Sequence, residues 1–464
     1  MSVRVMRSAV LGRRWRAALV MAAGFTTVVA SSTVAVVAGA GTAQAVAPSP
    51  APGDKGDKKS SDKGDPKQKR RSHEDDGKRY VECDPDALVA ALVSLNELRG
   101  GDLVLAKDCT YTLTANLDGN GLPRITQPIS IFGHGATIAR AANADSFRLF
   151  EVGPGGDLKL RKLTLTRGKA AEAGDDNEGG AIRVSGAGRL ELDDVKVLDN
   201  TVDILDQQDA GGLMNEGIAT VRDSTFHRNS GEDGAAIYSE GKTEITDSEI
   251  TSNIGDDEGN AVLYNDASMK LRNSLVSNNN AEDGGGLHND GVLEIEKSAI
   301  VDNVAGDDGG AIDNDGGALF VRDSVFKGNV AHLDGGALSL SEGSSIVDSE
   351  IADNAVISTD AQGGGVNVRT EEGEAVSIRR SKIVNNQAPG NGARGGGIFN
   401  EGEDDDDEGV LRLTDVKVTK NLSDAPAGGV HNNGTIFTYG KVRIVDNVPT
   451  NCEGSDNPVP NCFG

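Results

Sequence analysis

Apolar and polar residues alternate along much of the chain in short runs, and each run breaks at a serine and closes at an asparagine. Three consecutive copies are Met269-x-Leu271-x-x-Ser274-x-Val276-x-x-Asn279, Leu293-x-Ile295-x-x-Ser298-x-Ile300-x-x-Asn303 and Leu319-x-Val321-x-x-Ser324-x-Phe326-x-x-Asn329. An apolar residue at every second position is the period of a β-strand, whereas a helix repeats about every 3.6 residues. Each copy therefore predicts short strands with a bend at the serine.

The closing asparagine recurs between about residues 180 and 450. Its copies are Asn200, Asn229, Asn253, Asn279, Asn303, Asn329, Asn354, Asn386, Asn421 and Asn447, at intervals of 24 to 35 residues. Each copy opens with a Gly-Gly-apolar start, and one copy has too little apolar surface to fold alone, so the repeat indicates a solenoid. Asparagines at one turn of every coil can hydrogen-bond the coils above and below, which predicts an asparagine ladder.

The fold class predicted from this period is all-β, a single-stranded right-handed parallel β-helix. In this solenoid the coils stack about 4.8 Å apart and bury a shared aliphatic interior. Ankyrin-type and other helical arrays fit badly, since 61 glycines and few stretches of helical period would leave their helices unformed. One elongated domain is expected over residues 80–464, because a solenoid grows by adding coils.

Two short motifs within the copies carry a resemblance to a known family. They are Phe226-His227-Arg228-Asn229 and Phe326-Lys327-Gly328-Asn329, and the starts Gly179-Gly180-Ala181-Ile182, Gly309-Gly310-Ala311-Ile312 and Gly335-Gly336-Ala337-Leu338. They resemble the two motifs of polymorphic outer membrane protein repeats. Over about residues 80 to 464 the chain also resembles secreted bacterial right-handed β-helix proteins of the pectate-lyase-like superfamily. The resemblance implies this fold and an extracellular interaction role.

The sequence supplies a covering segment for each end of the predicted stack. The stack needs these segments because an open edge would pair with other chains. Asp84 is placed to cap a helix that begins at Pro85 and stops at Gly100-Gly101. The apolar stripe of this helix is Ala87, Leu88, Ala91, Leu92, Leu95 and Leu98. We predict an N-terminal cap over residues 80–110, coils over 111–448, and an irregular proline-rich C-terminal cap over 449–464.

The first 79 residues predict export and a tether. Residues 1–45 hold five arginines, an apolar stretch and then Ala43-Gln44-Ala45, the pattern of a cleaved signal peptide, with an uncleaved anchor as the alternative. Residues 46–79 are rich in Pro, Gly, Asp, Lys and Ser and predict a disordered charged linker. We therefore expect a secreted protein, extracellular or associated with the cell surface, without membrane contact after signal cleavage.

The net charge of the chain limits the classes of partner that it can bind. The formal net charge is −26, and it is −34 for the body once the +5 of the signal and the +3 of the linker are set aside. Because phosphate binding requires clustered lysines and arginines, this balance argues against nucleic acid and anionic lipid. We expect an extracellular protein or polysaccharide surface as the partner, and the oligomeric state stays open.

Four cysteines follow the signal, at Cys83, Cys109, Cys452 and Cys462. An even number in an exported chain indicates disulfides. Three connectivities are possible, and pairing near neighbours would place one bridge at each end of the stack. A zinc site fits poorly, since neither close pair has Cys-x-x-Cys spacing.

One residue of each opening strand is expected to point outward from the stack and to form a column. The column is Met214, Tyr238, Tyr264, His288, Asp313, Ser339, Phe399 and His431. Aromatic rings one or two coils apart suit sugar rings or a protein partner, so this column is the predicted binding face. Scattered surface aromatics without a role are the alternative.

Paired acids precede the Gly-Gly starts and predict an acidic stripe along the outside of the stack. The candidate calcium ligands among them are Asp256, Asp257, Asp283, Asp307 and Asp308. Carboxylates and turn carbonyls can supply the six or more oxygens that calcium prefers. The alternative is a solvated loop edge, since no EF-hand or nonapeptide calcium spacing is present. No other cofactor is predicted.

Patterns for catalysis are weak. Gly133-His134-Gly135 matches a fragment of polygalacturonase-like hydrolases, but the accompanying elements are missing and turn glycines explain it better. The basic residues that a lyase would use are Arg369, Arg379, Arg380 and Lys382. We predict no catalytic residue.

The favoured function is therefore a non-catalytic secreted β-helix rod for extracellular adhesion or for surface and glycan interaction. The alternative is a polysaccharide lyase or glycoside hydrolase that acts on an extracellular polysaccharide.

Overall fold

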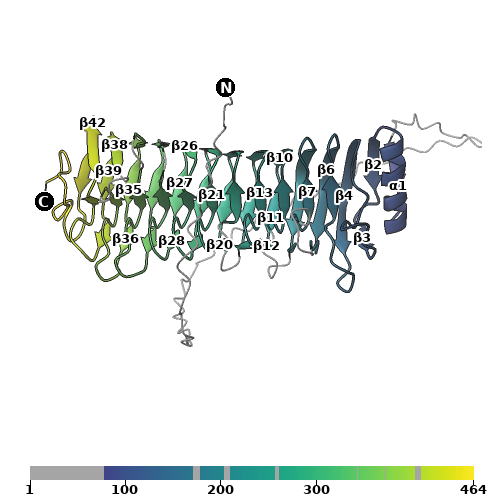
Figure 1. The fold of residues 1–464 in the computed structure, drawn as a ribbon, viewed down its shortest axis with the longest axis horizontal. Helices are drawn as coiled ribbons and strands as arrows, with labels where there is room; N and C mark the ends of the chain where they lie inside the picture. Colours follow the sequence, from purple (N-terminus) through teal and green to yellow (C-terminus); the bar gives the residue numbers. More distant parts are fainter. Residues whose placement is uncertain are drawn as a thin grey trace, which may run out of the picture. The chain divides into compact units, whose positions relative to one another are not determined.

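The computed structural model describes residues 78–170, 178–202, 209–255, 261–341, 343–370, 373–402 and 409–463. The predicted signal peptide and nearly all of the predicted linker lie outside these residues, as do Asp256 and Asp257. The described chain winds into about 13 turns of parallel strands (Figure 1). The predicted right-handed parallel β-helix fold is confirmed.

The described strands gather into three parallel sheets, and we call the largest of them sheet 1. Sheet 1 contains the bend at the serine, so each coil crosses it on both sides of the bend. Its strands are β1 (Lys78–Val81), β2 (Gly101–Leu105), β3 (Thr110–Leu113), β4 (Pro128–Arg140), β6 (Asp157–Thr166), β8 (Arg189–Leu198), β10 (Ile218–Arg222), β11 (Thr225–His227), β14 (Lys242–Thr246), β15 (Glu249–Thr251), β18 (Ser268–Arg272), β19 (Leu275–Ser277), β22 (Val292–Glu296), β23 (Ala299–Val301), β26 (Ala318–Arg322), β27 (Val325–Lys327), β30 (Ser344–Val347), β31 (Glu350–Ala352), β34 (Val376–Arg379), β35 (Lys382–Val384), β38 (Val410–Thr414), β39 (Lys417–Thr419), β42 (Thr435–Tyr439) and β43 (Arg443–Val445).

Sheet 2 is built from the strands that follow the Gly-Gly starts, and sheet 3 from the short strands that follow the closing asparagines. The strands of sheet 2 are β5 (Phe150–Val152), β7 (Ile182–Val184), β9 (Leu213–Asn215), β13 (Ile237–Ser239), β17 (Leu263–Asn265), β21 (Leu287–Asn289), β25 (Ile312–Asn314), β29 (Leu338–Leu340), β33 (Val366–Val368), β37 (Ile398–Asn400) and β41 (Val430–Asn432). Those of sheet 3 are β12 (Ser230–Gly231), β16 (Ile254–Gly255), β20 (Asn280–Ala281), β24 (Val304–Ala305), β28 (Val330–Ala331), β32 (Ala355–Val356), β36 (Gln387–Ala388) and β40 (Leu422–Ser423).

Equivalent residues of neighbouring coils pair with one another. Leu271 lies beside Ile245 of the preceding coil and Ile295 of the following one. The inward side chains therefore meet like side chains, and they form one continuous hydrophobic core from Val81 to Ile444. A single coil cannot bury its apolar side chains, so the stability comes from the interior that the stacked coils share.

Each bend of sheet 1 holds one residue in the left-handed region, with φ between 48° and 56°. These residues are His134, Lys162, Asp194, Asp223, Asp247, Asn273, Lys297, Asp323, Asp348, Arg380 and Asp415. The serine that follows accepts a hydrogen bond from the preceding coil, as when Ser274 Oγ accepts the backbone N–H of Ser248 at 3.1 Å. His134 of the Gly-His-Gly motif occupies an early bend, which gives that motif a structural role.

The closing asparagines form a buried column at the turn between sheets 1 and 3. Asn279 donates its side-chain amide to Oδ1 of Asn303 at 2.9 Å and its backbone N–H to the same oxygen at 3.1 Å. Oδ1 of Asn279 accepts the equivalent pair of bonds from Asn253. The same contacts link the asparagines from Asn200 to Asn447, so each coil is bound to the next through buried amides.

A second amide column, which the sequence pattern does not predict, lies at the end of sheet 2. Asn265 donates to Asn289, and Asn289 donates to Asn314, each at 2.6 Å. These asparagines thus also join neighbouring coils.

The N-terminal end of the stack is covered by α1 (Pro85–Glu97), which packs against β1 and β3 (Figure 1). Asp84 caps this helix by accepting the backbone N–H of Asp86 at 3.0 Å. The buried residues of α1 are Leu88, Ala91, Leu92 and Leu95. Leu98 is exposed, contrary to the predicted stripe, because the helix ends before it. In the described part of the chain no helix has the length and apolar character needed to span a bilayer.

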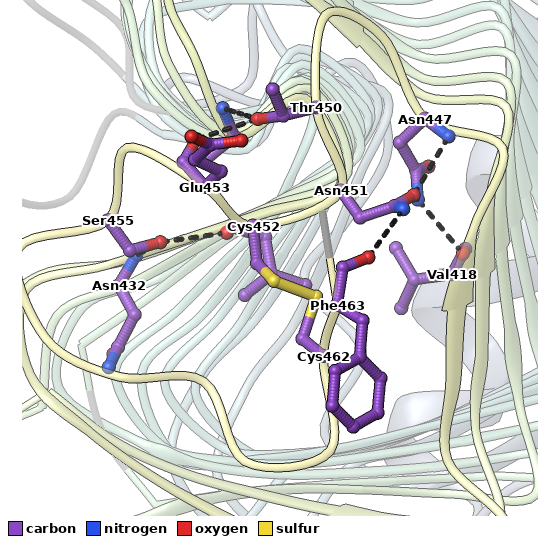
Figure 2. The surroundings of a disulfide bond; sticks show 12 residues. Val418, Asn432, Asn447, Thr450, Asn451, Cys452, Glu453, Ser455, Cys462 and Phe463 are labelled. Carbon is purple, nitrogen blue, oxygen red and sulfur yellow. Dashed lines mark hydrogen bonds between the residues drawn. A yellow bond between two sulfur atoms is a disulfide. The ribbon is translucent and has the colours of Figure 1, made fainter.

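The C-terminal cap completes the ladders with residues of an irregular loop. Figure 2 shows Asn451, whose Oδ1 accepts both amide donors of Asn447 at 3.1 Å and so takes the place of a further coil. Ser455 accepts the backbone N–H of Asn432 at 3.2 Å in the same way. The disulfide Cys452–Cys462 closes this loop, and Cys83–Cys109 joins the chain around α1, so each end of the stack has one bridge.

Replacing one rung of the asparagine ladder is expected to destabilise the stack. Asn279→Ala leaves the buried donors of Asn253 without their acceptor, which costs about 2–4 kcal/mol of unfolding free energy. Urea unfolding followed by circular dichroism measures this loss. Asn280→Ala, an exposed neighbour on β20, is the matched control, and an equal loss in both variants would contradict the role of the ladder.

Removing the C-terminal bridge is expected to loosen the cap. The double variant Cys452→Ala/Cys462→Ala loses a constraint on a short loop, which is worth about 2–3 kcal/mol by the chain-entropy estimate. Limited proteolysis should then cut after residue 449 earlier than in the parent protein, while the N-terminal coils keep their resistance. Unchanged cleavage would show that the Asn451 contacts alone hold the cap.

Candidate functional site

The predicted binding column lies on one line across sheet 2. Strand pairing aligns, in order, Met214, Tyr238, Tyr264, His288, Asp313, Ser339, Asn367, Phe399 and His431. The aromatic rings stack where they are adjacent, with ring centres 4.8 Å apart for Tyr238 and Tyr264 and 5.1 Å apart for Phe399 and His431. The predicted binding residues are thus brought together in two groups, and Ser339 and Asn367 lie between these groups.

The column differs from an open face in its exposure. Tyr264 is 9% exposed, His288 7% and Phe399 1%. The column has little exposure because the Gly-Gly start turns through a left-handed glycine and lies against it. A Cβ on Gly234 would stand only 2.7 Å from Cβ of Tyr238. The column is consequently a covered layer over most of its length.

A chain of polar contacts crosses the centre of the column. The ring of Tyr264 stacks on that of His288 at 4.9 Å, and its hydroxyl donates to a carboxylate oxygen of Asp290. Nε2 of His288 lies 3.2 Å from the other oxygen of Asp290, and Nδ1 lies 3.0 Å from Oδ2 of Asp313. His288 is therefore held between two carboxylates. Asp290 belongs to the turn after β21, and the sequence pattern gave it no role beyond that turn.

The charges of this cluster favour a permanently protonated histidine. Burial alone lowers the pKa of His288, but the hydrogen bonds and charges of Asp290 and Asp313 outweigh it and raise that pKa well above its usual value. Burial raises the pKa of Tyr264, and its bond to Asp290 raises it further. The raised pKa of His288 disfavours a neutral imidazole in this cluster, which is the form that a general base requires.

A column of half-buried acids runs beside sheet 2, at the residue before the left-handed start of several coils. Its members include Asp209, Asp233, Asp283, Asp308 and Asp334. Oδ1 of Asp308 accepts the backbone N–H of Asp334 at 2.8 Å, and Oδ1 of Asp334 accepts that of Gln362 at 2.7 Å. Burial, followed by the charge of neighbouring acids, raises the pKa of Asp209 and Asp308 to about 8 each. The predicted solvated stripe is therefore partly wrong, because these carboxylates join coils from within the turn.

The candidate calcium ligands do not converge in the described residues. Burial and the charge of Asp313 and Asp307 raise the pKa of Asp283 to about 7, and burial also raises that of Asp307. Asp283, Asp307 and Asp308 follow the turns of successive coils, and within the described chain no three carboxylate or imidazole groups have a metal-ligand arrangement. Calcium binding stays a prediction, with Asp256 and Asp257 outside the description.

The basic cluster suggested for a lyase is divided between two sheets. Arg369 follows β33 on sheet 2, where it contacts Glu401 at 2.6 Å and Asp334 at 3.7 Å. Arg380 lies at a bend of sheet 1 and pairs with Asp348 at 2.7 Å. Arg379 and Lys382 flank that bend. No shared site is formed by the four residues.

The outer face of sheet 1 is more open, and the sequence pattern did not single it out. Large apolar side chains exposed there include Phe320 at 49%, Phe437 at 43% and Tyr439 at 53%. A hollow of about 480 Å³ lies beside Phe320, Arg322 and Arg379. A second, of about 490 Å³, lies at the N-terminal end beside Tyr80 and His134. This face offers access that the column on sheet 2 lacks.

Comparison with known proteins finds no matching family model and no matching curated protein. Among solved structures, the Azotobacter vinelandii mannuronan C-5 epimerase AlgE6 A-module is similar at 14% identity and TM-score 0.45, over 77% of this chain and 94% of that one. The periplasmic alginate epimerase AlgG follows at 10% identity and TM-score 0.39, over 76% and 88%. Tailspike protein 3 of bacteriophage CBA120 has 13% identity and TM-score 0.31, over 82% and 62%. The resemblance to polymorphic outer membrane protein repeats stays a prediction.

The acid column predicts an unusual dependence of stability on pH. Because Asp209 and Asp308 keep their protons up to about pH 8 when folded, the folded state binds more protons than the unfolded chain above the usual value of 3.8. The contribution of these two carboxyls to the free energy of unfolding then falls as pH rises from about 4 to about 8. Urea unfolding at stepped pH values measures this slope.

Asp308→Asn keeps the acceptor for Asp334 but cannot ionise, so it is expected to raise the unfolding free energy at pH 8 by about 1 kcal/mol or more and to change little at pH 4. Asp323→Asn, at an exposed bend, is the control for a simple change of net charge. Equal effects of the two variants at both pH values would contradict the argument.

Proposed function

We propose that this protein is a secreted, non-catalytic β-helix rod that binds an extracellular glycan or cell surface through the outer face of sheet 1. The observation that carries the proposal is the contrast between its two long faces. The polar and aromatic column on sheet 2 is covered, whereas sheet 1 exposes aromatic and charged side chains coil after coil.

A repeated open face suits binding more than catalysis. An enzyme needs one place where groups of different protonation meet a substrate, whereas a rod can add weak contacts along its flank. The disulfides at both ends agree with an oxidising, extracellular setting.

The test is binding of the purified chain, from residue 46 onward, to a glycan array, to bacterial cell walls and to extracellular matrix proteins. We expect saturable binding to at least one of these surfaces. Replacing Phe320, Phe437 and Tyr439 by serine should weaken binding about tenfold or more, because exposed aromatic rings dominate such contacts. Phe463→Ser, an exposed phenylalanine of the C-terminal cap outside sheet 1, is the control, and uniform absence of binding would refute the proposal.

A second candidate function is a polysaccharide lyase or glycoside hydrolase, and the cluster of Tyr264, His288, Asp290 and Asp313 favours it. This cluster brings a tyrosine, a histidine and two carboxylates of sheet 2 into direct contact. Against it stand the burial of His288 and its raised pKa, which remove the neutral base that proton abstraction requires.

Incubation with a panel of polyuronates and neutral polysaccharides, with and without calcium, separates the two functions. The rod predicts no reducing ends and no unsaturated products. If products form, Tyr264→Phe should abolish them while the fold is kept, because that change removes only the hydroxyl. Product formation lost in this variant would establish the enzyme and displace the rod.

A further inference from the structure

The register of sheet 1 reveals an arrangement of arginines that the sequence alone does not display. On the strands before the bend, the outward residue nearest the bend forms one column along the stack. In coil order it reads Arg161, Asp193, Arg222, Thr246, Arg272, Glu296, Arg322, Val347, Arg379, Thr414 and Tyr439. From Arg161 to Arg379 an arginine stands on every second coil, which spaces the guanidinium stems about 10 Å apart.

A second outward column lies two residues earlier on the same strands. In coil order it reads Lys159, Glu191, Thr220, Glu244, Lys270, Glu294, Phe320, Ser345, Ser377, Arg412 and Phe437. The two columns together make the part of the open surface that lies before the bend.

The N-terminal half of this surface is neutralised by its own acids. Arg161 lies 3.1 Å from Asp193, Arg222 lies 3.8 Å from Glu191, and Arg272 lies 3.7 Å from Glu296. Exposed ion pairs of this kind add little stability, but they occupy the arginines.

The C-terminal half is different. From the coil of Phe320 to that of Phe437 the two columns contain no acid. Arg322, Arg379 and Arg412 are exposed and form no ion pair within 4.0 Å among the described residues. The nearest acids are Glu294 and Glu296, which lie beside Phe320 and Arg322 on the preceding coil, and the aspartates of the bends, where Asp348 is held by Arg380.

Aromatic rings border these three arginines. Phe320 lies on the first coil of the group, and Phe437 and Tyr439 lie on its last coil, all between 43% and 53% exposed. Ser345 and Ser377 fill the positions between, and the hollow of about 480 Å³ opens beside Arg322 and Arg379. We call Arg322, Arg379, Arg412, Phe320, Phe437 and Tyr439 the arginine patch.

We infer that the arginine patch binds an acidic polysaccharide, a chain of carboxylate-bearing sugars laid along the stack. This inference rests on the proposed function and names its ligand class and its residues. Guanidinium groups recognise carboxylates through paired hydrogen bonds, and exposed aromatic rings stack on the apolar faces of sugars. A ladder of coils repeats at about 4.8 Å, so an extended polymer meets an equivalent position at each coil.

The strongly negative net charge of the chain does not prevent such binding. Charges more than about 8–10 Å away are largely screened at physiological ionic strength, so the ligand responds to the local patch. Within the two columns, from the coil of Phe320 to that of Phe437, the patch carries three arginines and no carboxylate, and Glu294 and Glu296 of the preceding coil border it. An acidic polysaccharide fits better than nucleic acid or an acidic peptide, since the flat face presents aromatic rings at both ends and no groove that would enclose a backbone.

The experiment is calorimetric titration of the chain from residue 46 onward with oligogalacturonate of defined length, at low and at physiological salt. We expect binding that weakens as salt rises and that is lost when the carboxylates of the ligand are methyl-esterified. The triple variant Arg322→Gln/Arg379→Gln/Arg412→Gln should weaken binding about thirtyfold or more, since three charge-assisted contacts are removed. Circular dichroism melting verifies that the variant is folded.

The matched control is Arg161→Gln/Arg222→Gln/Arg272→Gln, which removes the same charge from the same face where the arginines are already paired. It should leave the affinity within about twofold of the parent chain. Equal losses in the two triple variants would overturn the patch in favour of a general charge effect.

Other outcomes separate this inference from the function it rests on. Binding to neutral glycans or cell walls, with none to oligogalacturonate, would overturn the inference and leave the rod standing. Equal affinity for polyglutamate or single-stranded DNA would overturn the polysaccharide as the ligand class. Absence of binding to every surface tested would refute both the inference and the proposed function.

Discussion

The structure depends on one constraint, which is that every coil rises by the same distance, so each side chain sits directly above its equivalent in the previous coil. This constraint makes the interior a continuous aliphatic column and lets Asn279 bond both Asn253 and Asn303. It also fixes where the chain bends, because one left-handed residue per coil must fall at the same level. The caps follow from it too, since Asn451 supplies the amide contact that the last coil would otherwise lack.

The same constraint forces like charges together where the repeated residue is acidic. Asp308 and Asp334 stand one coil apart. Burial and the charge of Asp334 raise the pKa of Asp308 to about 8, and burial raises the pKa of Asp334 to about 6. The carboxylates remain useful there because each accepts a backbone N–H of the next coil. On sheet 2 the repulsion between neighbouring carboxylates is reduced in another way, because the ring of His288 lies between Asp290 and Asp313.

The sequence predicts the fold well because its signals are local and repeated. The serine bend, the closing asparagines and the capped helix from Pro85 each follow from residues near one another in the chain, and the structure contains all three. The covering of Tyr264 and His288 was not predictable, because it depends on the path of a glycine turn over a neighbouring strand. The arginine column was hidden for another reason. Coils differ in length, so Arg322 and Arg379 align only when the pairing of β26, β30 and β34 is known.

The alternation of arginine-bearing coils with others shows that the structural unit here is a pair of coils. Between Asn229 and Asn329 the coils alternate between 24 and 26 residues, and Arg222, Arg272 and Arg322 stand 50 residues apart. Such a block carries two rungs of the asparagine ladder and one arginine of the outward column, and its two ends present matching edges. The gene can therefore lengthen or shorten the molecule by duplicating or deleting whole blocks, and each such event would preserve both the register of the interior and the rhythm of charge on its surface.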